Sequence, residues 1–187
     1  MFPKFLKKKY IIILAVVLLA VGVAVWYFGF APVVSVDGKN ASIGEFSKIK
    51  SAISHYDTVS GAVGTSTLPV ELNRRVLSNI IETMLVDKLV SGTDPSINQR
   101  AGDVVKEALA GNKSFSLAEA AKRLYGLSEK DFIDLILIPQ AKMNLLADYF
   151  KSEPAKLNAA WENTNKTADI KIYYPGYKWE NGEVIVK

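Results

Sequence analysis

The chain has 187 residues with no cysteine and a single histidine, His55, which is expected at the surface near a helix end. Without thiols it can form no disulfide framework, no cysteine-ligated metal site and no thiol nucleophile. The net charge of +4 comes from four lysines in residues 1–30, which contain no acid. Residues 31–187 are therefore neutral overall, and this balance gives no indication of nucleic-acid binding, which needs a basic patch on the folded domain.

The N-terminal part of the chain has the pattern of a membrane anchor. Residues 10–30 contain no charged side chain and are mostly aliphatic, and residues 1–9 supply the four lysines. As a helix with a rise of about 1.5 Å per residue, residues 10–30 would reach ~31 Å, the thickness of a bilayer's hydrocarbon core. Because lysines favour the cytoplasmic side, we expect a cytoplasmic flank at 1–9, one transmembrane helix at 10–30 and an extracytoplasmic domain at 31–187.

A cleaved signal peptide is the alternative interpretation of the same segment. Its basic start fits, but the apolar block is longer than the usual ~7–15 residues of a signal-peptide core. Residues 29–31 loosely resemble a cleavage site, but Pro32 follows directly, and proline is a poor residue at that position. An uncleaved anchor in the cytoplasmic membrane is therefore the favoured prediction.

The domain after the anchor is predicted to begin with a short strand and a capped helix. Residues 33–36 are mainly β-branched and precede an Asp-Gly turn signal. Ser42 and Glu45 have the spacing of a capping box, which predicts a helix start. Residues 57–68 are rich in Gly, Ser and Thr without any period, and they read as a mobile loop.

The clearest helix of the sequence is predicted at 69–90. Its apolar residues form two adjacent rows, which predicts a helix buried in the core. These rows are Leu72, Val76, Ile80 and Met84, and Leu77, Ile81, Leu85 and Leu89. A weaker helix is expected at 97–110. A second capping box, Ser116 with Glu119, predicts a short helix that ends at Gly126.

A last long helix is predicted at 129–151, capped by Ser128. Pro139 lies inside this helix and removes a backbone donor. We therefore expect the helix to bend near Leu135, four residues earlier.

The end of the chain changes to a period of two and predicts a small β element at 169–187. Residues 170–174 alternate, and residues 177–186 read as a hairpin around Asn181-Gly182. We further expect residues 33–36 to pair with these C-terminal strands. The predicted fold is mainly α, a helical domain with a small C-terminal β hairpin.

The order of these elements resembles the N-terminal domain of SurA-type and PrsA-type chaperones, which is similar in fold to the trigger-factor chaperone domain. The resemblance covers about residues 33–172. It is carried by the turn after the first strand, Glu45-Phe46, the long helix at 75–89, the junction at 125–132 and Pro139-Gln140. It implies an ATP-independent chaperone that binds unfolded, apolar or aromatic-rich segments. Such proteins usually carry a parvulin-type prolyl isomerase domain, which we do not expect here because only 18 residues follow Asp169.

The resemblance predicts a holding chaperone whose partners are unfolded or partly folded envelope proteins. The alternative is an envelope scaffold or structural subunit that docks one specific partner through the same fold. A third interpretation is a degenerate prolyl isomerase, for which the sequence shows no catalytic pocket. We therefore expect no enzymatic activity, no cofactor, no metal and no nucleic-acid partner.

The residues expected to contact a bound peptide lie around the predicted proline bend. There they would line an apolar crevice, and methionine adapts to varied partners. These candidates are Phe132, Ile136, Met143, Leu146, Tyr149 and Phe150.

Two further patterns have alternative interpretations. Residues 117–128 look like the first helix and turn of a DNA-binding helix-turn-helix. However, Glu129, Asp131 and Asp134 in the would-be recognition helix would repel phosphates. The same acids could form a metal or acid–base cluster, but acids that complement the dipole at a helix N-terminus are the more common case.

Overall fold

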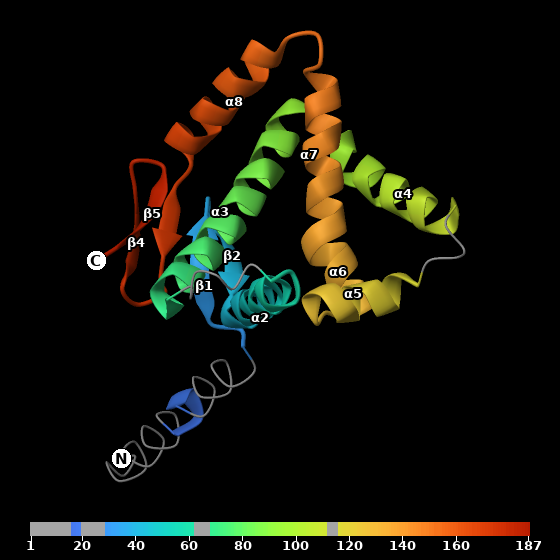
Figure 1. Ribbon diagram of the computed structural model, residues 1–187. Coiled ribbons are helices and arrows are strands. Elements are labelled where there is room, and N and C mark those ends of the chain that lie inside the picture. Colours follow the sequence, from blue (N-terminus) through green and yellow to red (C-terminus); the bar gives the residue numbers. More distant parts are fainter. Residues whose placement is uncertain (1–15, 20–28, 62–67, 112–115) are drawn as a thin grey trace, which may run out of the picture.

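The computed structural model describes residues 16–19, 29–61, 68–111 and 116–187 (Figure 1). In these ranges the chain is mainly helical with a small β part, as predicted. None of the helices in these ranges has both the length and the apolar character needed to cross a bilayer. The expected transmembrane segment, 10–30, lies mostly outside the described residues and stays a prediction.

A three-stranded antiparallel sheet joins the two ends of the domain. Strand β1 (Pro32–Val36) lies between β2 (Lys39–Ser42) and β3 (Ile170–Ile172). Val34 pairs with Ala41 on one side and with Ile172 on the other. The predicted pairing of 33–36 with a C-terminal strand is therefore confirmed.

Strand β2 was not predicted from the sequence, because its four residues show no apolar alternation. It forms because Asp37 and Gly38 both have positive φ, 49° and 81°, which reverses the chain tightly after β1. Only Ala41 of β2 is buried. The turn geometry and the neighbouring strand thus determine this element.

The helices follow the predicted order with two corrections. They are α2 (Ile43–Val59), α3 (Pro69–Thr93), α4 (Ser96–Gly111), α5 (Leu117–Tyr125), α6 (Glu129–Phe132), the π-helical turn η1 (Ile133–Leu137), α7 (Ile138–Tyr149) and α8 (Pro154–Thr167). Helix α8 was not predicted. The expected loop at 57–68 is wrong in its first part, because α2 continues to Val59; residues 62–67 lie outside the described residues.

The predicted helix caps are confirmed. The side-chain oxygens of Ser42, Ser116 and Ser128 each accept a hydrogen bond from the backbone N–H three residues later, at 3.1–3.2 Å. Gly126 ends α5 in the left-handed conformation, with φ 66°. These serines satisfy backbone donors that a helix start leaves unpaired, which explains why the three helices begin at the predicted positions.

The predicted C-terminal hairpin is also confirmed. Strands β4 (Tyr177–Glu180) and β5 (Glu183–Val186) pair around Asn181 and Gly182, both with positive φ, as a tight two-residue turn requires. The hairpin forms a sheet of its own. It is fastened to the start of α3 by the Tyr177 hydroxyl, which donates to the carbonyl of Val70 at 2.9 Å.

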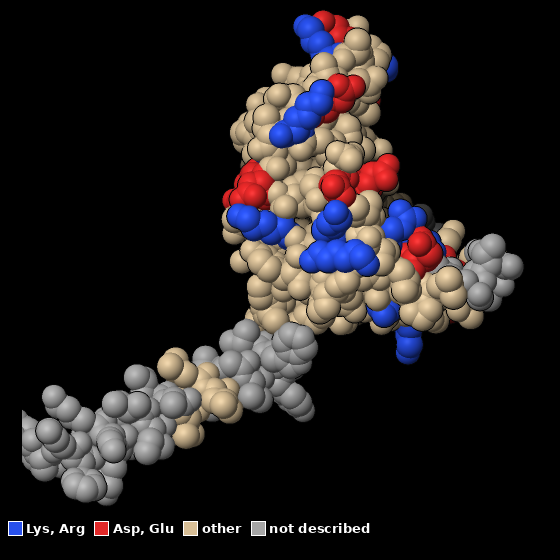
Figure 2. All heavy atoms as spheres, turned by 90° about the vertical axis from the view of Figure 1, so that its left-hand side faces the viewer, with Lys and Arg blue, Asp and Glu red and all other residues tan. Residues whose placement is uncertain are grey.

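Charges on the side of the molecule that carries β4, β5 and α8 occur in pairs of opposite sign. Figure 2 shows blue and red side chains interspersed over this face. The ion pairs include Lys178 with Glu180, Lys171 with Asp169 and Lys156 with Glu153. Exposed pairs of this kind contribute little to stability.

Helix α3 is the centre of the core. Its first half packs under the sheets and α2 in one cluster, which we call the sheet cluster; its buried members include Val34, Phe46, Leu77, Ile81, Leu85 and Val184. Its second half joins α4 and α7 in the upper cluster, which consists of Val86, Leu89, Val90, Ile97 and Leu146. Helices α3 and α7 therefore meet at their C-terminal ends, at the top of Figure 1.

A prediction concerns Asp37, which connects the sheet to α3. Its carboxylate accepts the backbone N–H of Asp169 at 2.8 Å and pairs with Lys88 at 2.8 Å. The Lys88 hydrogen bond, followed by that of Asp169, lowers the pKa of Asp37. Asp37→Asn should therefore lower the free energy of unfolding at pH 7, by less than about 1 kcal/mol because the pair is exposed.

The pH dependence of the free energy of unfolding tests whether the Asp37 carboxylate causes this effect. A carboxyl whose pKa is lower in the folded state stabilises the fold above its unfolded pKa, about 3.9, and loses that contribution as the pH falls. In urea unfolding, the difference between wild type and Asp37→Asn should shrink below about pH 4. Asp103→Asn, an exposed acid on α4, is the control. A difference that stays constant with pH would contradict the assignment.

Candidate functional site

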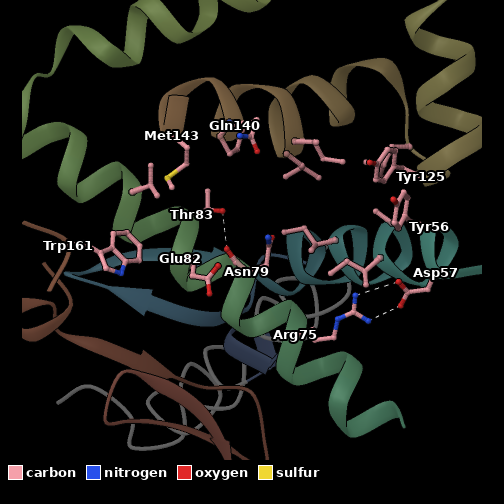
Figure 3. A pocket seen from close by; sticks show the side chains of 18 residues that line it. Tyr56, Asp57, Arg75, Asn79, Glu82, Thr83, Tyr125, Gln140, Met143 and Trp161 are labelled. Carbon is pink, nitrogen blue, oxygen red and sulfur yellow. Dashed lines mark hydrogen bonds and ion pairs between the residues drawn. The ribbon is translucent and has the colours of Figure 1, made fainter. Parts of the chain in front are cut away.

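A groove of about 430 Å³ opens between α3 and the η1–α7 segment, with α2 as its floor (Figure 3). Two sides of the groove, the α2 floor and the η1–α7 wall, are lined mainly by apolar residues. Helix α2 contributes Ile49 and Ile53, and the η1–α7 wall contributes Leu135, Ile136 and Pro139. Its volume lies within the range of roughly 300–1,000 Å³ that binding sites for small ligands occupy.

The third wall, on α3, is polar. Arg75, Asn79, Glu82 and Thr83 line the groove, and only Val86 continues the row as an apolar residue. Spacings of three and four residues put these side chains on one face of the helix. This face is adjacent to the two buried rows that hold α3 in the core. Apolar packing along these two adjacent rows therefore fixes α3 in the core and leaves a polar strip towards α7.

The η1–α7 wall owes its shape to Pro139. A proline has no N–H, so the carbonyl of Leu135 cannot accept the usual helical hydrogen bond from four residues later. The chain responds with the π-helical turn η1, in which the N–H of Ile138 donates to the carbonyl of Ile133. A bend was predicted near Leu135; at this position the structure has a π turn. Ile133 packs towards α4 while Leu135 and Ile136 line the groove.

Aromatic rings form one end of the groove. Tyr56 on α2 and Tyr125 on α5 stack with ring centroids 5.2 Å apart, and Phe132 lies 5.1 Å from Tyr125. Beside them, Arg75 donates to both carboxylate oxygens of Asp57, at 2.8 and 3.4 Å. This end is therefore aromatic and has its charges paired.

His55 holds this end together. Its Nε2 lies 3.1 Å from the carbonyl oxygen of Arg123, and its ring lies against Gly126, where an added Cβ would approach it to 3.4 Å. His55 lies about one turn before the end of α2 at Val59 and its hydrogen bond is exposed, in agreement with the expected surface position near a helix end. The ring is half-buried and joins α2 to α5.

The opposite end of the groove combines Trp161 of α8, Met143 of α7 and Glu82 of α3 (Figure 3). Trp161 is half-buried and packs on both the sheet cluster and the upper cluster. Glu82 has neither an ion-pair nor a hydrogen-bond partner among the residues that the structure describes. Burial raises the pKa of its carboxyl.

The six residues expected to contact a peptide are placed differently from one another. Ile136 and Met143 line the groove, and Phe132 touches its aromatic end through Tyr125. Leu146 is only 1% exposed and belongs to the upper cluster. Tyr149 and Phe150 lie outside the groove, with rings edge to face at 5.0 Å; Phe150 packs against the upper cluster and Tyr149 is exposed.

Sequence reasoning missed most of the groove. The α2 and α3 walls were taken for core and ordinary surface, and Trp161 lies on a helix that was not predicted. One available signal was the polar row on α3, since 75, 79, 82 and 83 recur at helical spacing beside a stripe already assigned to the core.

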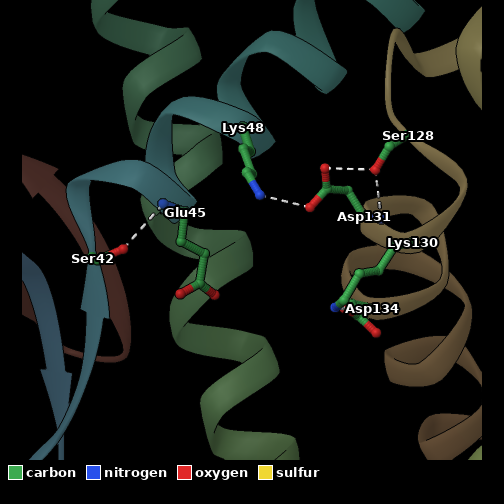
Figure 4. Close-up of polar contacts among 7 residues, drawn as sticks. All are labelled: Ser42, Glu45, Lys48, Ser128, Lys130, Asp131 and Asp134. Atoms are coloured by element: carbon green, nitrogen blue, oxygen red, sulfur yellow. Dashed lines mark hydrogen bonds and ion pairs between the residues drawn. The ribbon is translucent and has the colours of Figure 1, made fainter. Parts of the chain in front are cut away.

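Two of the three acids near Ser128, Asp131 and Asp134, form ion pairs outside the groove (Figure 4). Asp131 accepts hydrogen bonds from Lys48 Nζ at 2.7 Å and from the Ser128 hydroxyl at 2.8 Å. The Lys48 bond contributes most to lowering the pKa of Asp131. Asp134 pairs with Lys130 one turn earlier. The Lys48–Asp131 pair joins α2 to α6 beside the groove.

A second prediction tests which of the six candidate residues lie in the core and which line the groove. Leu146→Ala should lower the free energy of unfolding by about 2–5 kcal/mol, because it empties space in the upper cluster. Met143→Ala, at a position that is 46% exposed, should cost less than about 1 kcal/mol. Chemical unfolding of both variants measures the contrast. Equal costs would contradict these placements.

Comparison with protein-family models, with curated proteins and with solved structures found no match to the chain. The chemistry of the site is that of a binding groove with two apolar walls, one polar wall and aromatic side chains at both ends.

Proposed function

We propose that this protein holds extended, apolar segments of unfolded polypeptides in the groove between α3 and α7, as an ATP-independent chaperone. The observation that carries this proposal is the contrast between the groove walls. A bound segment can place apolar side chains against Ile53, Leu135 and Ile136 while its backbone faces the polar row of α3. An extended peptide can satisfy both kinds of wall, because its backbone N–H and C=O groups point sideways, roughly perpendicular to its side chains.

Polar groups on both sides of the groove suit a peptide backbone. Asn79 and Thr83 lie on α3, and Gln140 lies across from them on α7 (Figure 3). An amide side chain can donate and accept hydrogen bonds at once. Such contacts do not depend on the client's side chains, which favours binding of many sequences. Met143, with its flexible thioether, supports the same breadth.

We further propose that the domain works outside the cytoplasm, held by the N-terminal segment as a membrane anchor. The uncharged block at 10–30 and its lysine flank support this. At the described junction, the N–H of Gly44 donates to the carbonyl of Gly29 at 3.0 Å, and that of Ile43 to the carbonyl of Ala31 at 2.7 Å. These bonds join the start of α2 to the last residues of the predicted anchor and to the residue that follows it. The resemblance to SurA-type domains adds support for the function.

Cross-linking at defined positions tests this proposal. The full chain in lipid nanodiscs would carry a photoreactive phenylalanine derivative in place of Met143 in the groove or, as a control, Tyr149 outside it. We expect residue 143 to cross-link to several unrelated envelope proteins while they are unfolded and not to their folded forms. Residue 149 should give little product.

Two results would overturn the proposal. Equal cross-linking at both positions would show that the groove is not the binding site. Cross-linking of residue 143 to one folded partner alone would favour the scaffold function over the chaperone function. Suppression of aggregation by the same preparations, without ATP, provides the functional comparison.

A further inference from the structure

One charge in the groove has no counter-charge of its own. Three charged residues line the groove, and Asp57 and Arg75 neutralise one another at the aromatic end. Glu82 remains at the other end, exposed and unpaired within the described ranges. Its carboxylate lines the groove and is accessible to a cationic group of a ligand.

The residues around Glu82 have the composition of a subsite with apolar walls and a single carboxylate. Val86 follows Glu82 by one helical turn and belongs to the upper cluster, against which Trp161 packs. Met143 lies on the opposite wall at the same end (Figure 3). The indole ring of Trp161, the thioether of Met143 and the carboxylate of Glu82 all line this end of the groove.

We propose that this end of the groove binds the lysine or arginine side chain of a held segment, with Glu82 as its counter-ion. This inference rests on the proposed function and adds which clients are preferred. The aliphatic stem of lysine or arginine would lie along Met143 and Val86, and the cationic group would meet the carboxylate. The Trp161 indole adds attraction for a cation near its face.

Charge complementarity favours this occupant over other polar side chains. A basic residue gives Glu82 the partner it lacks, whereas an acidic residue would meet like charge there. A neutral amide would leave the carboxylate without a counter-charge. The groove therefore prefers apolar segments that contain a basic residue over equally apolar segments that contain none.

Peptide binding to the full chain in neutral lipid nanodiscs tests this inference. Three labelled peptides would share one apolar sequence and differ only at one central position, which is lysine, glutamine or glutamate. We expect wild type to bind the lysine peptide roughly five- to tenfold more tightly than the glutamine peptide in fluorescence anisotropy. Empty nanodiscs correct for binding to lipid.

Three variants locate the effect. Glu82→Gln should remove the preference for lysine, and Glu82→Lys should shift the preference to the glutamate peptide. Glu45→Gln is the control: burial raises the pKa of the Glu45 carboxyl as it does that of Glu82, but Glu45 lies outside the groove. This control should keep the wild-type preference.

The outcomes separate the inference from the function on which it rests. If wild type binds all three peptides equally, or if Glu82→Gln keeps the preference for lysine, the subsite does not exist but the holding function stands. An equal loss of preference in Glu45→Gln would mean non-specific attraction, and it would also overturn the subsite. If wild type binds none of the peptides, the proposed function fails together with the inference.

Discussion

The rest of the structure depends on how α3 is packed. Its apolar stripe is buried along the whole helix, in the first half under the sheets and in the second half against α4 and α7, so the helix cannot rotate or move without exposing core residues. The neighbouring face is polar and points towards the η1–α7 wall. Because Asn79 and Thr83 gain little from packing against Leu135 and Pro139, the helices meet only where α3 becomes apolar, around Val86. The groove is the space that this pattern leaves open.

The floor and ends of the groove are held by polar and aromatic contacts between helices. The Lys48–Asp131 pair joins α2 to α6, and His55 joins α2 to α5. Each is an exposed or half-exposed interaction, individually weak. Together with the stacked rings of Tyr56 and Tyr125, they connect helices that are far apart in sequence and that form the rim of the groove. The apolar core fixes α3, and these contacts fix what surrounds it.

The sequence was sufficient to predict the elements that are determined by contacts between residues close together in the chain. Serine caps, the Asn181-Gly182 turn and the apolar rows of α3 act within a few residues, and the structure has these elements where they were predicted. Strand β2 and helix α8 were missed. The first depends on its partner strand, and the second has few apolar residues: Leu157, Ala160 and Trp161 are the ones that pack on the upper cluster.

The groove was hard to predict for a related reason. Its residues come from α2, α3, α5, η1, α7, α8 and the junction between α5 and α6, and each set alone has the pattern of core or of solvent-exposed surface. The sequence pointed to the η1–α7 side through Pro139, and there Ile136 and Met143 do line the groove. It could not show that Leu146, three residues beyond Met143, turns into the core. That distinction depends on the angle between α3 and α7, which is a tertiary property.

The central claim is that the polar row of α3 keeps the groove open for a peptide. The most direct test is the thermal unfolding midpoint of an Asn79→Leu, Thr83→Val double variant, measured with and without an apolar peptide. Wild type should gain stability when the peptide binds. The account predicts that the double variant unfolds at a higher temperature than wild type, by about 2–4 °C for each kcal/mol gained, because α3 can close on α7. It should then gain nothing from the peptide. A double variant that unfolds at or below the wild-type midpoint and is still stabilised by the peptide would contradict the account.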